Sequence, residues 1–184
     1  MRRRNCCAGS SPGGGTGRLG ALPPDPRSIW TKMKVKSMRE IDIPPLWLAI
    51  FLALAWALAL MIPWHPFGVV GQGLGGAVVL AGLGLMGLAL AQMLLGRTTF
   101  IPRRDPSALV TGGVFRLSRN PIYLGDAMVL TGAALWLDAP LALLLVPLFM
   151  AFIARRYIRD EEARLEAQFG AAYHEWAARV RRWL

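Results

Sequence analysis

Four apolar segments limit what this chain can fold into more than any other feature. They cover residues 45–62, 69–95, 122–137 and 139–154. A helix needs roughly 20 residues to cross a hydrocarbon core of about 30 Å, so the first two segments are long enough and the last two are short. Asp138 and Pro140 mark a tight turn between the short pair. The pattern predicts an all-α integral membrane bundle of about four transmembrane helices.

The basic residues lie outside these segments, and connecting segments that are rich in Lys and Arg alternate along the chain with connections that have none. Of the 21 lysines and arginines, nine precede the first segment, five lie between Arg97 and Arg119, and seven follow from Arg155. The positive-inside rule then places both termini and the central loop in the cytoplasm, as expected for a protein of an inner or plasma membrane. The net charge of +10 therefore indicates contact with anionic lipid headgroups and argues against nucleic acid.

The first 40 residues differ in composition from the rest of the chain. They are basic and rich in Gly, Ser and Pro, and they contain no apolar run that would form the core of a signal peptide. Such a segment cannot bury enough surface to fold, so residues 1–40 are predicted to be a disordered leader and residues 41–184 a membrane domain. Translation from Met33 or Met38 is a hypothesis that N-terminal sequencing of the native protein tests.

The tail, residues 155–184, has a helical periodicity of its own. Apolar side chains recur there at steps of three, four or seven residues, the spacing of one helical face. The other positions are mostly charged or Ala, so we expect an amphipathic helix, bent at Gly170, that lies along the cytoplasmic interface or folds back over the central loop. The apolar face consists of Ile158, Leu165, Phe169, Tyr173, Trp176, Val180 and Trp183.

One glycine-rich stretch has the form of a nucleotide-binding fingerprint. GQGLGG, residues 71–76, fits G-x-G-x-x-G, but that motif requires a preceding strand and an acidic residue about 20 positions later, and the sequence offers neither. Gly71 and Gly75 are better explained as small residues that let two membrane helices approach closely.

An acidic residue stands inside the third apolar segment. A charged side chain within a membrane helix costs about 3 kcal/mol on insertion scales, so Asp126 should face a polar interior with a partner. Arg116 and Arg119, in the arginine-rich loop before this segment, are the nearest candidates. The alternative is that Asp126, about one turn into the helix, reaches the interface by snorkelling.

Three acidic residues follow the fourth segment. Asp160 and Glu161 have arginines at helical spacing, and such pairs can be solvated ion pairs. Glu162 has no Lys or Arg three or four residues after it, and it lies at the edge of the apolar face, toward whatever the tail covers. A carboxylate in that position, opposite a loop of arginines, indicates a functional site, with a structural ion pair as the alternative.

Two motifs carry a family resemblance. TGGVFRLSRNPIYLG, followed by RDEEARLEAQFGAAYHEWAARVRRWL, resembles the isoprenylcysteine carboxyl methyltransferase and phospholipid methyltransferase superfamily. Members carry Arg-His/Asn-Pro-x-Tyr-x-Gly and, further along, a Glu-Glu pair leading into Phe-Gly-x-x-Tyr. The resemblance covers roughly residues 96–184. The matching positions here are Arg119, Asn120, Pro121, Tyr123, Gly125, Glu161, Glu162, Phe169, Gly170 and Tyr173.

The resemblance implies methyl transfer from S-adenosylmethionine in a small helical membrane protein, without a metal. It implies Arg119 and Glu162 as catalytic residues. The implied cofactor-binding positions are Arg116, Asn120, Pro121, Tyr123, Gly125, Glu161 and Tyr173, and the implied substrate-binding positions are Arg103, Asp126 and Trp176. Relatives often place a His after the Pro of the loop, whereas Pro102 is followed here by Arg103, which always carries a charge and leaves the substrate class open.

These features predict a membrane methyltransferase that acts on a lipid-like or amphipathic acceptor entering from the bilayer. Methyl transfer is an in-line displacement that depends mainly on positioning two reactants and on excluding water. The sequence leaves the acceptor atom (O, N or S) and the oligomeric state open. The alternative is a non-catalytic membrane protein that binds anionic lipid or a partner through its basic loop and tail.

Overall fold

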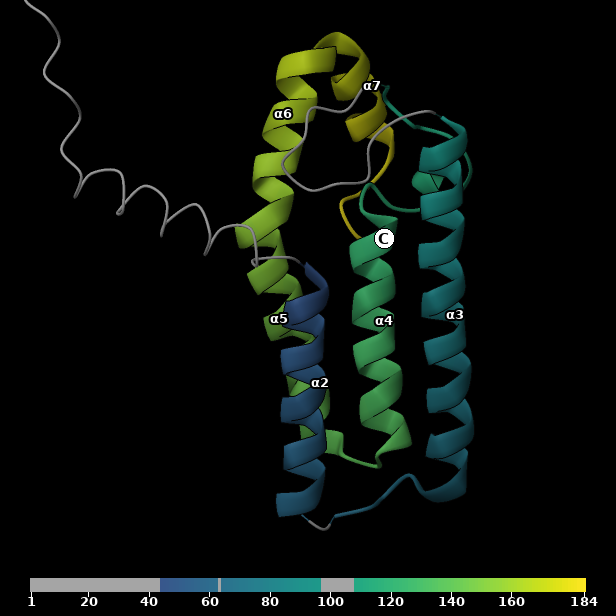
Figure 1. The fold of residues 1–184 in the computed structure, drawn as a ribbon, viewed down its shortest axis with the longest axis vertical. Coiled ribbons are helices and arrows are strands. Elements are labelled where there is room, and N and C mark those ends of the chain that lie inside the picture. The colour runs from purple at the N-terminus through teal and green to yellow at the C-terminus, as the bar shows by residue number, and fades with distance from the viewer. Residues whose placement is uncertain (1–43, 63, 97–107) are drawn as a thin grey trace, which may run out of the picture. The chain divides into compact units, whose positions relative to one another are not determined.

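The computed structural model describes residues 44–62, 64–96 and 108–184, and these residues form helices and connecting turns without strands (Figure 1). The predicted all-α class is therefore confirmed. The predicted leader and Arg103 lie outside the described residues. The elements are α2 (Pro44–Met61), α3 (Gly68–Leu95), η1 (Gly113–Arg116), α4 (Pro121–Trp136), η2 (Pro140–Leu144), α5 (Leu145–Ile153), η3 (Ala154–Ile158), α6 (Arg159–Phe169) and α7 (Ala171–Arg179).

Three helices in the described part of the chain are long and apolar enough to cross a membrane. They are Pro44–Met61, Gly68–Leu95 and the continuous helical run Pro140–Phe169. The apolar windows of the first two are only 17% and 11% buried within the protein, as expected for helices whose outer faces meet lipid. At 16 residues α4 is shorter, so a fourth span stays a prediction.

The short helix α4 lies between α3 on one side and α2 and α5 on the other (Figure 1). Most of its residues are buried, including the polar residue Asp126. Because neighbouring helices cover α4, the groups near its beginning are held in a rigid surrounding, which suits a site that must fix the positions of reactants.

Glycines allow α3 and α4 to pack at backbone distance. A Cβ atom built at Gly75 would lie 2.5 Å from the carbonyl oxygen of Gly132, and one at Gly132 would lie 2.6 Å from that of Gly75. At Gly71 a Cβ atom would lie 3.2 Å from the carbonyl oxygen of Leu135. The close approach predicted for Gly71 and Gly75 is confirmed.

Gly75→Ala is expected to lower the thermal unfolding midpoint of the detergent-purified protein. The added methyl group would meet the backbone of α4, which cannot move aside as a flexible side chain can, and overpacking of this kind costs about 1–3 kcal/mol. Gly73→Ala is the matched control, because a Cβ atom there meets no described atom within 4 Å. Equal midpoints for the two variants would contradict the close packing.

The tail departs from the single helix predicted for residues 155–184. The π-helical turn η3 joins α5 to α6 without a break, so the helix that begins in the membrane continues to Phe169. Gly170 takes a φ of 47°, which favours glycine, and produces the predicted bend before α7. Helix α7 ends at Arg179, and Val180 is extended with φ −120° and ψ 127°. Residues 180–184 are not helical, because their backbone bonds to the segment before α4.

The apolar face of the tail covers α3 and η1. Tyr173, Trp176 and Val180 are buried in one cluster with Ala89 of α3 and Phe115 of η1. Of the two placements predicted for the tail, the structure therefore shows the one in which it folds back over protein.

The opposite end of the bundle is fixed by the turn at Asp138. Its carboxylate accepts hydrogen bonds from the backbone N–H groups of Phe67 at 2.7 Å and Gly68 at 2.8 Å, where α3 begins. A carboxylate in this position satisfies donors that the first helical turn leaves unpaired and interacts favourably with the helix dipole. The turn that joins α4 to η2 therefore also fixes the start of α3.

Candidate functional site

The candidate site lies where α4 begins. Pro121 is the first residue of α4, a position where the missing N–H leaves no helical bond unmade. The backbone N–H of Asn120 donates to the hydroxyl of Ser118 at 3.1 Å, and Ser118 has no exposed surface. Arg119 lies between them, and its guanidinium contacts side chains of α6 and α7. The start of α4 therefore presents Arg119 to the tail.

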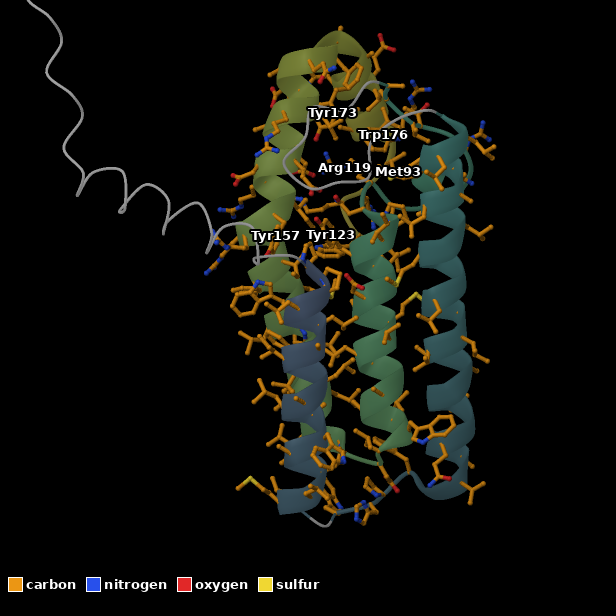
Figure 2. All side chains as sticks on the ribbon, viewed as in Figure 1. Met93, Arg119, Tyr123, Tyr157, Tyr173 and Trp176 are labelled. Atoms are coloured by element: carbon orange, nitrogen blue, oxygen red, sulfur yellow. The ribbon has the colours of Figure 1, made fainter. Side chains whose placement is uncertain are left out.

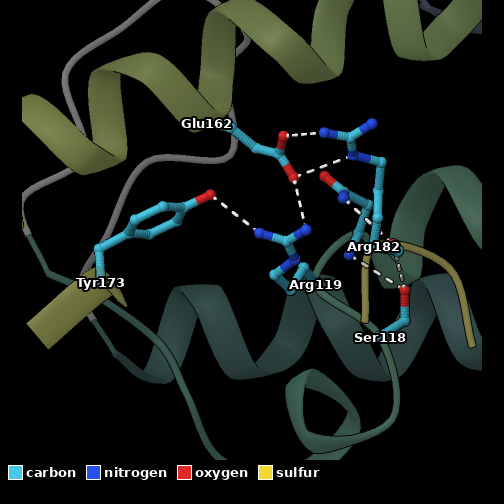
Figure 3. A network of polar contacts seen from close by, with 6 residues as sticks. Ser118, Arg119, Glu162, Tyr173 and Arg182 are labelled. Atoms are coloured by element: carbon cyan, nitrogen blue, oxygen red, sulfur yellow. Dashed lines mark hydrogen bonds and ion pairs between the residues drawn. The ribbon is translucent and has the colours of Figure 1, made fainter. Parts of the chain in front are cut away.

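A network of charged side chains centres on Glu162 of α6 (Figure 3). Arg182 binds the carboxylate at both oxygens, from Nε to Oε1 at 3.1 Å and from Nη2 to Oε2 at 2.5 Å. Nη2 of Arg119 lies 3.3 Å from Oε1 of Glu162. Nη1 of Arg119 donates to the hydroxyl of Tyr173 at 3.2 Å. The two arginines and one glutamate leave an excess of one positive charge at this point.

The network is largely shielded from solvent. The exposed fractions of the side chains are 15% for Glu162, 18% for Arg119 and 36% for Arg182. The hydrogen bond to Glu162 raises the pKa of Arg182 above its ordinary value. Burial first, and then the charge of Glu162, raise the pKa of Tyr173, so its hydroxyl stays protonated while it accepts the bond from Arg119.

Tyr173 is expected to make stability fall at alkaline pH. Because its folded pKa is raised, its neutral form contributes stability that is fully present below the ordinary value of 10.0 and is lost as the pH rises through the raised value. Thermal unfolding measured from neutral pH to beyond about pH 10 should show a larger fall in midpoint for the wild type than for Tyr173→Phe. Parallel curves for the two proteins would contradict the burial of this hydroxyl.

A second polar layer lies further along α4. The hydroxyl of Tyr123 donates to Oε1 of Glu161 at 2.8 Å, and the ring centroid of Tyr123 lies 6.4 Å from that of Tyr157 (Figure 2). Asp126 lies one turn beyond Tyr123 on α4 and is 3% exposed. Glu161 therefore accepts a hydrogen bond from a buried tyrosine hydroxyl. The sequence spacing predicts only ion pairs between Glu161 and arginines of its own helix.

Asp126 does not meet its predicted partners. Among the described residues, no hydrogen bond or ion pair joins it to Arg116 or Arg119. Arg119 precedes α4 and contacts the tail instead, and Arg116 is exposed at the end of η1. Since Asp126 is buried, its position favours the interior over the snorkelling alternative.

Two other predicted site residues have packing contacts. A Cβ atom at Gly125 would lie 2.8 Å from the carbonyl oxygen of Gly82, so this glycine lets α4 pack against α3. Nε1 of Trp176 donates to the carbonyl oxygen of Phe115 at 3.2 Å, which fixes α7 on η1. The cofactor and substrate contacts expected of Gly125 and Trp176 stay predictions.

Sequence reasoning misses Arg182. A helix continued to residue 184 would turn Arg182 away from the apolar face that contains Val180. The extended backbone at Val180 instead returns Arg182 to Glu162. Arg159 stands three residues before Glu162, so helical spacing gives no signal for a partner at residue 182.

Two arginine nitrogens are buried without a hydrogen-bond acceptor in the described part of the chain, Nε of Arg119 and Nη1 of Arg164. A buried donor of a charged group is costly to leave unpaired, and each such group in a native fold calls for an explanation. No described residue supplies an acceptor for Nε of Arg119.

The fold and the site define a helical integral membrane protein whose polar centre is built from the loop before α4 and from the tail. The family model described as phospholipid methyltransferase matches residues 65–172, more than half of the chain. The chain therefore belongs to the phospholipid methyltransferase family, which confirms the superfamily resemblance and indicates a membrane methyltransferase. A Haemophilus influenzae protein, named only as an uncharacterized protein, is 40% identical over 63 residues, which are 34% of this chain and 100% of that relative.

Proposed function

We propose that this protein transfers a methyl group from S-adenosylmethionine to a lipid-like or amphipathic acceptor at the cytoplasmic face of the membrane. The observation that carries the proposal is the contact between Arg119 and Glu162, which joins the two sequence motifs in one shielded network. Both residues lie within the part of the chain that matches the family.

The residues present fit S-adenosylmethionine. The cofactor carries a carboxylate, and the buried Nε of Arg119 is an unpaired charged donor suited to it. The amide groups at the start of α4 add partial positive charge on the same side. Tyr173 and Trp176, whose ring centroids lie 6.0 Å apart, are buried aromatic side chains, and we propose that they contact the sulfonium or the adenine. When bound, the cofactor supplies an activated methyl group whose sulfonium charge is lost on transfer.

Glu162 acts on the cofactor mainly through Arg119. A carboxylate has about four acceptor positions, and three of them are taken by the pair with Arg182 and by Nη2 of Arg119. The remaining position can accept one donor, such as a ribose hydroxyl or the cofactor amine. Because Tyr173 and Glu162 hold the two Nη groups, Nε of Arg119 is the donor that would bind the cofactor.

We place the acceptor on the membrane side of this network, toward Asp126 of α4, and the substrate contacts of Trp176 and Arg103 stay predictions. Asp126 and Tyr123 are both buried on α4, so a headgroup that contacts them is shielded from bulk water. Exclusion of water favours attack on a sulfonium over hydrolysis and strengthens the polar contacts around the reacting atoms. An isoprenylcysteine carboxylate, as the superfamily resemblance suggests, and a phospholipid amine are the two acceptor classes to compare.

Transfer of radioactive label tests the proposal. Detergent-purified protein is incubated with methyl-tritiated S-adenosylmethionine and with either phosphatidylethanolamine or a farnesylated cysteine derivative. We expect label in the organic phase with one of these acceptors, and none with heat-treated protein or Arg119→Ala. If folded protein labels neither compound, nor any component of a total membrane lipid extract, the proposed activity is wrong.

A non-catalytic membrane protein that binds anionic lipid or a partner is the second candidate. Arg155 and Arg159 are exposed just beyond α5, where a positively charged rim would meet anionic headgroups. This function predicts that Glu162→Gln leaves lipid binding unchanged and that no label is transferred, whereas the enzyme loses turnover in that variant.

A further inference from the structure

The segment after α7, residues 180–184, returns to the start of α4. The backbone N–H of Arg119 donates to the carbonyl oxygen of Arg181 at 2.9 Å. The carbonyl oxygen of Arg182 accepts hydrogen bonds from Oγ of Ser118 at 3.1 Å and from Nδ2 of Asn120 at 3.3 Å (Figure 3). Residues 118–120 are therefore tied to two consecutive residues of this segment by three hydrogen bonds.

Side chains anchor the same segment on both sides of Arg182. Val180 is 7% exposed and belongs to the buried cluster with Tyr173 and Trp176. Trp183 packs against the other core cluster. Since the chain is fixed before and after Arg182, its guanidinium has a defined place, and it binds both oxygens of Glu162.

We propose that residues 180–184 form a strap that sets the geometry of the cofactor site, with Arg182 as its positioning residue. The strap holds the backbone of Arg119 through Arg181 and the carboxylate of Glu162 through Arg182. Without Arg182, the freed oxygen of Glu162 competes for Nε of Arg119, which is then no longer directed at the cofactor. This inference rests on the proposed function and adds a residue that acts through Glu162.

Equilibrium binding of S-adenosylmethionine to the detergent-purified full chain tests the strap, with wild type beside Arg182→Gln and Arg182→Lys. Loss of a charged bidentate pair corresponds to about ten-fold to hundred-fold in affinity, and we expect Arg182→Gln to raise the Kd by that factor. Lysine restores the charge but not the planar fork, so Arg182→Lys should recover only part of the affinity. Arg179→Gln removes an equal charge from an exposed side chain that bonds to the carbonyl oxygen of Glu175, and it should bind as wild type.

Steady-state kinetics separate positioning from a merely structural role. A positioning residue for the cofactor raises the KM for S-adenosylmethionine in Arg182→Gln, while kcat at saturating cofactor and the KM for the acceptor stay within about two-fold of wild type. A fall in kcat with an unchanged KM, or a Kd equal to that of wild type, would overturn the strap and leave the proposed function standing. Failure of the folded wild type to bind S-adenosylmethionine would overturn the proposed function and the strap together.

Discussion

Arg119→Lys is expected to weaken S-adenosylmethionine binding by about a hundred-fold, which corresponds to the roughly 3 kcal/mol that two charged hydrogen bonds contribute. The guanidinium of Arg119 reaches Tyr173 through Nη1 and Glu162 through Nη2, and Nε, which has no acceptor among the described residues, is the donor proposed for the cofactor. A lysine ammonium keeps the charge, but it lacks the planar guanidinium whose three nitrogens point in three different directions. Titration calorimetry on detergent-purified protein measures the change in Kd.

The matched control for Arg119→Lys is Arg155→Lys. Arg155 is an exposed arginine of η3, so the same chemical change there should leave the Kd at its wild-type value. Both variants should unfold at similar temperatures, which separates lost binding from lost folding. Wild-type affinity in Arg119→Lys would remove Arg119 from the site.

Glu162→Gln is expected to weaken cofactor binding strongly and also to lower the free energy of unfolding. The substitution leaves Arg119 and Arg182 facing each other without the carboxylate that separates their charges. Removing one partner of a buried ion pair costs about 3–5 kcal/mol. Because Arg182 is partly exposed, water screens part of this repulsion, so about 1–3 kcal/mol is expected here. Chemical or thermal unfolding in detergent, beside calorimetric titration, gives both quantities.

Glu166→Gln is the control for this second prediction. Glu166 lies on the same helix with a side chain that is 54% exposed, and its partner His174, at 3.2 Å, is 62% exposed. An exposed pair of this kind contributes little to stability, so Glu166→Gln should match the wild type in unfolding and in binding. If Glu162→Gln behaved like Glu166→Gln, the network would be incidental to both stability and binding.

The sequence predicts that Glu162 faces the arginine-rich loop, and the resemblance groups Glu162 with Arg119, but the partner predicted for Arg119 is Asp126. The break at Asn120 and Pro121 starts a helix directly after Arg119, and helical spacing places Glu162 at the edge of the apolar face. The covered face of the tail then brings the two together. The roles of both residues in catalysis stay predictions until binding and turnover are measured.

Arg182 and the end of the tail helix could not be predicted in the same way. The composition from Ala171 to Leu184 favours helix throughout, and intrinsic propensity is a weak guide where tertiary contacts compete. Here the backbone after Arg179 bonds to Ser118, Arg119 and Asn120, which are distant in sequence and whose positions depend on the folded bundle.

The sequence also does not predict that α5 continues into α6, for a related reason. The charged run that begins at Arg155 indicates where the chain leaves the membrane, but leaving the membrane does not end a helix. The π-helical turn η3 carries the helix across this boundary to Phe169. The contact between Glu161 and Tyr123 depends on that continuity, so it too lies beyond what residue spacing can predict.

Equilibrium binding of radiolabelled S-adenosylmethionine to the folded wild-type protein, with competition by S-adenosylhomocysteine, tests the central claim most directly. A cofactor site at the Arg119–Glu162 network predicts saturable binding of one molecule per chain in the micromolar range, displaced by the competitor, which keeps the carboxylate and adenosine that the site would hold. Absence of saturable binding, in protein whose thermal unfolding is cooperative, would contradict the methyltransferase function proposed for this chain.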